Sequence, residues 1–127
     1  MTRADEAGRQ AGVRLLAVAP GSAQTALTVQ ERHVNGHGIC HGGYLFLLAD
    51  AALAYACNSY GVSAVAAGAD IAFLRPVPLG ADLVAEAVER ARTGRSGLYD
   101  VTVRHGDVVV AEFRGRTRQV PGLAQPT

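Results

Sequence analysis

One charged side chain, Asp50, stands in the otherwise uncharged run of residues 44–57, and it is the residue best suited to chemistry in this sequence. A carboxylate is costly to bury unless it has a partner or a task. It can act as a general base on water, or attack a carbonyl carbon directly to form a mixed anhydride, and the sequence leaves both roles open. The non-catalytic alternative is that Asp50 caps or pairs with another buried polar group.

Two glycines, Gly42 and Gly43, immediately precede this apolar run and mark the expected start of a helix. The first N–H groups of a helix have no partner within it, and the helix dipole favours negative charge there. Glycine also allows a substrate carbonyl to approach the backbone closely. We therefore expect the Gly43 N–H to stabilise an oxyanion during catalysis, and Gly42 to help bind the substrate.

Asp50 and Gly43 cannot serve the same reacting carbonyl within one chain. They are seven residues apart, which corresponds to roughly 10 Å along a helix. A twofold dimer with antiparallel helices would bring Asp50 of one subunit to the Gly43 end of the other, and a self-complementary interface makes that pairing twice. The spacing therefore favours an active site shared between two subunits.

Asn35 and His41 are candidate catalytic residues in the connection before the helix. The Asn35 amide could orient water or the substrate carbonyl, or could only hold a turn. His41 is expected to support the glycine turn.

Four residues in the same connection resemble a metal-binding cluster: His33, His37, Cys40 and His41. Gly36 and Gly38 disfavour the helix that would align them, and no carboxylate lies in register. We expect no metal site.

The composition fits one soluble domain spanning residues 1–127, with 49% hydrophobic residues and a net charge of +1. The basic residues are dispersed, which argues against nucleic acid as a partner. The apolar run is shorter than the roughly 20 residues of a membrane span, and the first residues lack the apolar core of a signal peptide. With only two cysteines, the sequence favours a cytoplasmic location.

Apolar periodicity and turn residues predict one antiparallel sheet of five to six strands wrapped around one long central helix, an α+β fold. Residues 81–92 also carry Glu86 and Arg90 at helical spacing, but their alternation favours a strand. The expected elements are an N-terminal helix or arm at 1–12, strands at 13–18 and 22–29, a connection at 30–43, the helix up to Gly61, a buried strand at 62–74, strands at 81–92, 98–105 and 108–120, and a flexible tail at 121–127.

The central segment resembles the hotdog-fold acyl-CoA thioesterases of the PaaI type, which serve phenylacetate degradation. The resemblance rests on residues 33–46, with Asn35 and the His41-Gly42-Gly43 turn, and on the Leu48-Ala49-Asp50 segment that follows. The same motif continues at 54–59, and the resemblance extends over residues 13–120, with supporting strand matches at 73–76, at 93–94 with 97–100, and at 111–115.

This resemblance implies a hotdog fold, a dimer whose two sheets join, commonly a tetramer of two such dimers, and thioester hydrolysis without a metal or separate cofactor. Coenzyme A would be part of the substrate. In the family, the positions that match the following residues line the active site: Asn35, His41, Gly42, Gly43 and Asp50. The chain departs from the family in the third strand, where Gly68, Ala69 and Ala72 replace residues that often include a hydroxyl or thiol and an aspartate.

The expected reaction is hydrolysis of phenylacetyl-CoA or a hydroxylated or related aryl-acetyl-CoA. Arg92 and Arg95 could contact the phosphates of coenzyme A, or belong to a solvated loop. Tyr44, with Phe46 and Tyr55, could line an aromatic acyl pocket, or belong to the core. The alternatives are an acyl hydratase or dehydratase using Asp50 and His41, and a non-catalytic acyl-CoA-binding module.

Overall fold

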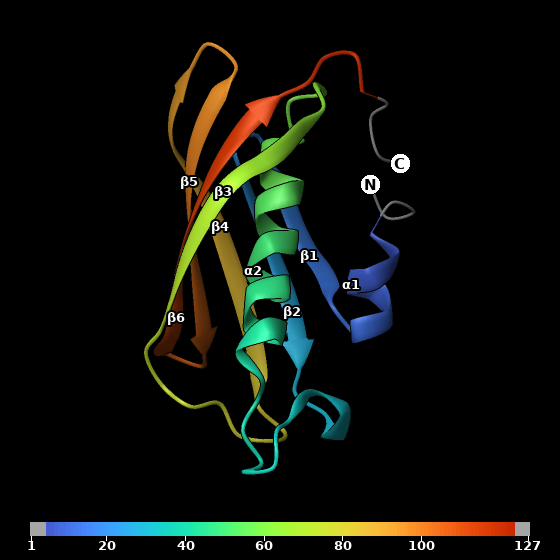
Figure 1. Ribbon diagram of the computed structural model, residues 1–127, viewed down its shortest axis with the longest axis vertical. Helices are drawn as coiled ribbons and strands as arrows, with labels where there is room; N and C mark the ends of the chain where they lie inside the picture. Colours follow the sequence, from blue (N-terminus) through green and yellow to red (C-terminus); the bar gives the residue numbers. More distant parts are fainter. Residues whose placement is uncertain (1–4, 124–127) are drawn as a thin grey trace.

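The structure, a computed structural model, describes residues 5–123. A six-stranded sheet curls around one long helix, α2 (Gly42–Cys57), as Figure 1 shows. The strands are β1 (Arg14–Ala19), β2 (Ser22–Thr28), β3 (Ala64–Phe73), β4 (Asp82–Thr93), β5 (Ser96–His105) and β6 (Val108–Gln119), with a short helix α1 (Glu6–Ala11) and a 3-10 turn η1 (Glu31–His33). The predicted α+β hotdog architecture is confirmed.

The sheet has the strand order β1-β2-β4-β5-β6-β3, and every neighbouring pair is antiparallel. β3, which follows α2, thus pairs with β6 rather than with β2, which precedes the helix. As a consequence β1 and β3 form the two edges of the sheet, with α2 lying across its concave face (Figure 1).

Close packing holds α2 against the sheet. Leu48 and Leu53 on the helix are almost fully buried, as are Tyr99 and Phe113 on the strands facing them. Gly115 of β6 lies directly under the helix, because a Cβ atom there would stand 2.6 Å from a methyl carbon of Leu53. The helix is thereby fixed in position along the sheet.

The helix ends earlier than its sequence predicts. It stops at Cys57 with Asn58 as the C-terminal cap, whereas Gly61 was expected to end it. The Asn58 amide donates to the carbonyl of Ala54 and accepts the N–H of Ala64, so a side chain replaces the glycine cap. Gly61, at φ +83°, forms the turn that follows.

The prediction that residues 62–74 form a buried strand is wrong about burial, although β3 is a strand. In the described part of the chain its outer edge has no neighbouring strand, and Val65 and Phe73 are 42% and 53% exposed. An apolar run indicates that the side chains of a strand are to be buried. It does not indicate whether this chain or another molecule buries them. Among residues 5–123, only β6 pairs with β3.

The helix or arm predicted at residues 1–12 agrees with α1 over the residues described, and Gly12 caps that helix in the left-handed conformation. Of the tail predicted at 121–127, only residues 121–123 are described. There the Ser63 hydroxyl donates to the Leu123 carbonyl at 2.9 Å, which ties this segment to the start of β3. Within residues 5–123, no helix has the length and apolar character needed to cross a membrane.

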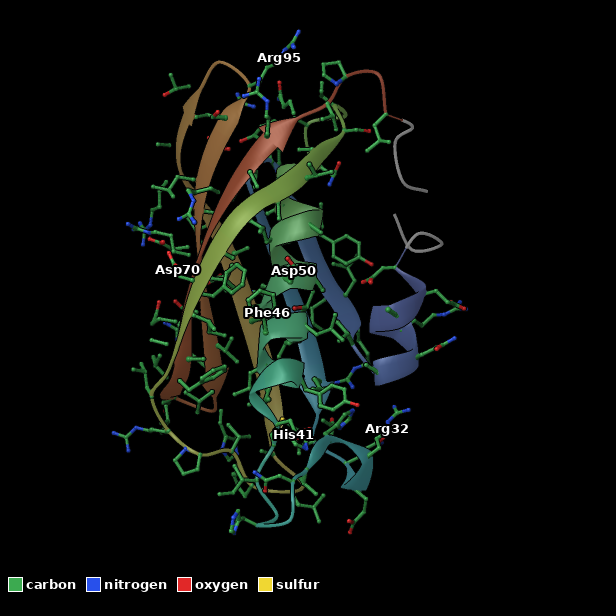
Figure 2. The ribbon with its side chains drawn as sticks, in the orientation of Figure 1. Arg32, His41, Phe46, Asp50, Asp70 and Arg95 are labelled. Atoms are coloured by element: carbon green, nitrogen blue, oxygen red, sulfur yellow. The ribbon has the colours of Figure 1, made fainter. Side chains whose placement is uncertain are left out.

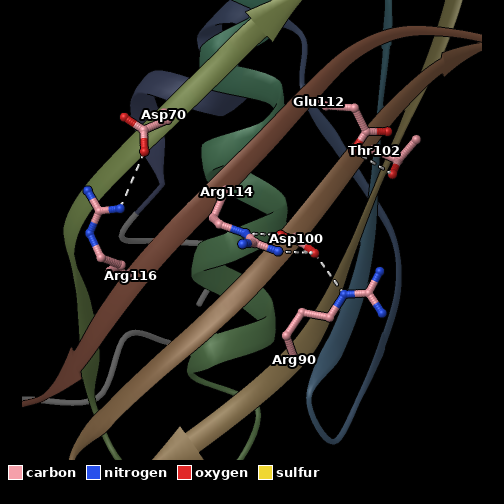
Figure 3. A network of polar contacts seen from close by, with 7 residues as sticks. All are labelled: Asp70, Arg90, Asp100, Thr102, Glu112, Arg114 and Arg116. Carbon is pink, nitrogen blue, oxygen red and sulfur yellow. Dashed lines mark hydrogen bonds and ion pairs between the residues drawn. The ribbon is translucent and has the colours of Figure 1, made fainter.

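The convex face of the sheet carries a network of ion pairs (Figure 3). Asp100 of β5 accepts hydrogen bonds from Arg114 of β6 at 2.7 Å and Arg90 of β4 at 2.8 Å. Arg116 reaches Asp70 on β3 at 3.4 Å. The bonds from Arg114 and Arg90 hold the pKa of Asp100 below its ordinary value. The centre of the convex face, around Asp100, is therefore polar and internally paired.

Candidate active site

One side of α2 carries a strip of four residues that are at least partly exposed, Gly43, Phe46, Asp50 and Ala54, here called the open strip. Their spacing of three or four residues places them one above another on one side of the helix, and none of them is buried. The Phe46 ring also lies edge-on against Phe113 of β6, with centroids 5.2 Å apart. Figure 2 shows Phe46 and Asp50 on this side, with His41 at the start of the helix. The open strip thus aligns the helix start with the predicted base.

The start of α2 is uncapped. His41 occupies the N-cap position without a side-chain hydrogen bond to the backbone, and the first N–H that bonds back is that of Tyr44, to the His41 carbonyl at 3.0 Å. Within residues 5–123, no group accepts a hydrogen bond from the N–H of Gly42 or Gly43. These two donors can therefore bind an oxyanion.

The two glycines at this start differ in their surroundings. A Cβ atom at Gly42 would lie 2.7 Å from the ring of Phe73, which packs directly on the backbone. A Cβ atom at Gly43 would meet nothing within 4 Å. Gly42 is needed for packing, whereas Gly43 faces open space through which a substrate can approach.

Asp50 is half-buried, and its carboxylate makes no hydrogen bond or ion pair with any group in residues 5–123. Burial raises its pKa above the ordinary value, and the negative charge of Asp5 raises it further. A carboxylate that has lost part of its hydration and has no partner is a stronger base than one in water. This is the state that a general base or a nucleophile requires.

Of the two roles that its sequence position leaves open, Asn35 has the structural one, holding a turn. Its Oδ1 accepts the N–H groups of His37 and Ile39 at 2.9 and 3.2 Å and thereby holds a tight turn. Its Nδ2 has no partner among the described residues, so the amide N–H groups are available to a ligand.

The histidine that braces this region is His33, which the sequence analysis considered only as a metal ligand. His33 is fully buried; its Nδ1 accepts the Gln30 N–H at 2.8 Å, and its Nε2 lies 2.6 Å from the Ala11 carbonyl. Because Nδ1 is the acceptor, Nε2 carries the proton and donates it. The spacing of Gln30 and His33, as in a capping box, is the signal that could have identified this role.

The predicted brace, His41, is exposed. Tyr44, a predicted substrate contact, instead lies edge-on against the buried His33 ring, with centroids 4.7 Å apart. Both His33 nitrogens are occupied by backbone groups, and among residues 5–123 no three His, Cys, Asp or Glu side chains are grouped to hold a metal.

Arg92 and Arg95 lie at the end of the molecule opposite His41, as the labelled Arg95 shows (Figure 2). The Arg92 guanidinium stacks over the Tyr60 ring at 4.0 Å and lies 3.8 Å from the Glu89 carboxylate. Arg95 is exposed, and its side chain makes no ion pair within the described part of the chain. One chain alone does not bring either arginine to the start of α2.

Two cavities flank the open strip. One, of about 360 Å³, lies at the helix start and is lined by Gly42, Leu45, Phe73 and Arg75 among others. The second, of about 290 Å³, lies beyond Asp50 between α2 and the start of β3.

Several known proteins resemble this chain in sequence. The profile of the thioesterase superfamily matches residues 37–112. The acyl-coenzyme A thioesterase PaaI of Escherichia coli (strain K12) is 41% identical over 93% of this chain and 85% of its own length. Human acyl-coenzyme A thioesterase 13 is 29% identical over 90% of this chain and 85% of its own.

Solved structures show the same relationship. The E. coli PaaI protein from the phenylacetic acid degradation operon superposes with a TM-score of 0.91 at 40% identity, covering 94% of this chain and 88% of that one. The TT0310 protein of Thermus thermophilus gives a TM-score of 0.88 at 38% identity, covering 91% of this chain and 98% of that one. This chain therefore belongs to the thioesterase superfamily and is a hotdog-fold enzyme of the PaaI type.

Proposed function

We propose that the chain hydrolyses aryl-acetyl-CoA thioesters, phenylacetyl-CoA or a hydroxylated relative, to the free acid and coenzyme A. The observation that carries this proposal is the half-buried, unpartnered Asp50 on the same strip as an uncapped helix start. The similarity to E. coli PaaI, which comes from a phenylacetic acid degradation operon, supports the aryl-acetyl group.

The active site is completed by a second copy of the chain. The outer edge of β3 has no neighbour in the sheet, and its apolar side chains are exposed beside the open strip. Two β3 strands paired antiparallel about a twofold axis would continue the sheet and set the two α2 helices antiparallel. Asp50 of the partner subunit then faces Gly43. A homotetramer of two such dimers in the cytoplasm belongs to the same proposal.

In this shared site the thioester oxygen accepts the N–H of Gly43, and the Asn35 amide orients the carbonyl or the water. Asp50 of the partner subunit removes a proton from water as the oxygen attacks the carbonyl carbon, or attacks that carbon itself. In both routes the carbon–sulfur bond breaks and coenzyme A leaves as a thiolate that takes up a proton. In the second route water then hydrolyses the mixed anhydride, which releases the free acid and restores the Asp50 carboxylate. Arg95 is the better phosphate contact, because Arg92 is held by Tyr60 and Glu89.

The substrate is tested by a survey of thiol release, using an Ellman-type reagent with phenylacetyl-, hydroxyphenylacetyl-, benzoyl- and straight-chain acyl-CoA. We expect the highest kcat/KM with the two aryl-acetyl thioesters. A hydratase or a binding module would release no thiol, so an absence of release from every thioester contradicts the proposal.

The pH dependence of the reaction tests the base. Because burial and Asp5 raise the pKa of Asp50, log(kcat/KM) is expected to rise with unit slope and to level off above the ordinary aspartate value of 3.8. The matched control is Asp100→Asn, which removes a convex-face carboxylate and should leave the inflection in place. If the residual activity of Asp50→Asn still rises with pH over the same range as wild type, a residue other than Asp50 is the base.

A further inference from the structure

The cavity beyond Asp50 is a chamber between the C-terminal half of α2 and the start of β3, closed at one side by Leu123. We infer that this chamber, here called the acyl cavity, binds the acyl group of the substrate and that Leu123 determines which acyl groups fit. The inference rests on the proposed function, because it takes Asp50 as the group at the reacting carbonyl. The walls of the acyl cavity include Leu53, Ala54, Cys57, Val65, Ala66 and Leu123.

The walls of the acyl cavity are apolar where a ligand would touch them. Asn58 bonds to the backbone of Ala54 and Ala64, and the Ser63 hydroxyl donates to the Leu123 carbonyl, so both polar residues are engaged with the protein. Burial raises the pKa of the Cys57 thiol to about 11, which keeps it neutral. Asp50, at the mouth, is the one charged residue of the lining. Such a chamber favours an uncharged hydrocarbon group beside the carboxylate.

The volume of the acyl cavity suits a phenylacetyl group. An apolar cavity of about 150 Å³ is enough to bind benzene. The acyl cavity, at about 290 Å³, has roughly twice that volume, which leaves room for the methylene and the carbonyl. An acetyl group would leave most of it empty.

The cavity at the helix start suits the other end of the substrate. It is the more open of the two cavities, and the exposed Arg75 lies on its rim. An open cavity with a cationic rim suits the pantetheine arm, which leads to the phosphates of coenzyme A. In the shared dimer, the helix start of one subunit meets Asp50 of the other. The two cavities then lie on opposite sides of the carbonyl, one for the pantetheine arm and one for the acyl group.

Leu123 can change the acyl cavity without disturbing the fold. Its N–H donates to the Val120 carbonyl at 2.9 Å and its own carbonyl accepts from Ser63, so the backbone is held independently of the side chain. The side chain itself is 54% exposed and forms part of the cavity wall. Substitutions here therefore alter the wall alone.

The test compares Leu123→Trp, which fills the cavity, with Leu123→Ala, which enlarges it. One methylene in an apolar pocket discriminates about 10- to 200-fold, so Leu123→Trp should lower kcat/KM for phenylacetyl-CoA about tenfold or more, and for acetyl-CoA less than threefold. Leu123→Ala should shift the preference from phenylacetyl-CoA towards octanoyl-CoA about tenfold. Val108→Ala, an exposed valine at the start of β6, is the control and should change neither ratio.

Ala66→Leu narrows the same cavity from β3 and should act like Leu123→Trp, provided that the melting temperature and the dimer mass are unchanged. If both filling variants slow all thioesters equally, or slow none, the acyl group does not bind in this cavity and the inference is overturned. That result leaves the proposed function intact as long as wild type releases thiol and Asp50→Asn does not.

Discussion

Asp50→Asn is expected to lower kcat on phenylacetyl-CoA by about 10³-fold, because a positioned general base contributes 10² to 10⁴. The amide keeps the shape of the carboxylate but can neither take a proton from water nor form an anhydride. Within residues 5–123 no other carboxylate lies on the open strip to replace it. Thiol release under single-turnover conditions measures the loss of the chemical step directly.

The same substitution is expected to stabilise the fold at neutral pH. The pKa of Asp50 is raised in the folded state, so the fold favours the protonated form and disfavours the carboxylate. Wild type therefore loses stability as the pH rises through the folded pKa, whereas Asp50→Asn does not. The difference in melting temperature should be largest at neutral pH and vanish as the pH falls towards 3.8, the ordinary value of an aspartate.

Asp100→Asn is the matched control, because the pKa of Asp100 is lowered where that of Asp50 is raised. Arg114 and Arg90 lower the pKa of Asp100, so its contribution to stability is present above the ordinary value and is lost as the pH falls through the lowered one. This variant should be less stable than wild type at neutral pH and fully active. If Asp50→Asn is as active as wild type, or if it gains no stability at neutral pH, Asp50 is not a desolvated base.

The sequence identifies the helix and the candidate base because both depend on local physics. A lone carboxylate in an apolar run requires an explanation wherever the run lies, and two glycines before it mark the helix start. Alternation likewise predicts strands at β4 and β5, and a two-residue turn signal predicts that the chain returns as β6. Neither signal predicts that β3 lies at an edge, because an apolar strand at a dimer edge has the same composition as a strand buried within one chain.

The residues around the base were harder to predict, since their roles depend on contacts across the chain. His33 and His41 are the same residue type eight positions apart, and only the carbonyl of Ala11, far away in sequence, makes the first a buried brace. Arg92 at the end of β4 and Arg95 in the turn that follows are three positions apart, yet the Tyr60 ring and Glu89 engage only Arg92. Such distinctions come from tertiary structure and not from sequence spacing.

Gly43→Ala should remove activity without loss of stability. A methyl group there meets nothing within 4 Å in the single chain, but it would project into the space where the substrate carbonyl approaches. We expect kcat/KM to fall about 10²- to 10³-fold, the effect of losing one oxyanion contact. Gly42→Ala should instead lower the melting temperature, because its Cβ atom would lie 2.7 Å from the Phe73 ring.

These two inactive variants together test whether the active site is shared between subunits. In a heterodimer of one Asp50→Asn and one Gly43→Ala subunit, one site contains both changes and the other contains neither, because each site takes Gly43 from one chain and Asp50 from the other. Random exchange at equal concentrations makes half of the dimers heterodimers, each with one intact site. The mixture should recover about a quarter of wild-type activity, whereas either variant alone stays inactive.

Heterodimers are isolated with two different affinity tags on co-expressed subunits, so that their presence is established before activity is measured. Mixing Asp50→Asn with Asp50→Ala is the control, since both sites of that heterodimer lack the carboxylate and no activity should return. Isolated Asp50→Asn/Gly43→Ala heterodimers with no thiol release would place both residues in a site formed by one chain. Because Gly43 and Asp50 are about 10 Å apart along one helix, such a site would require α2 itself to deform.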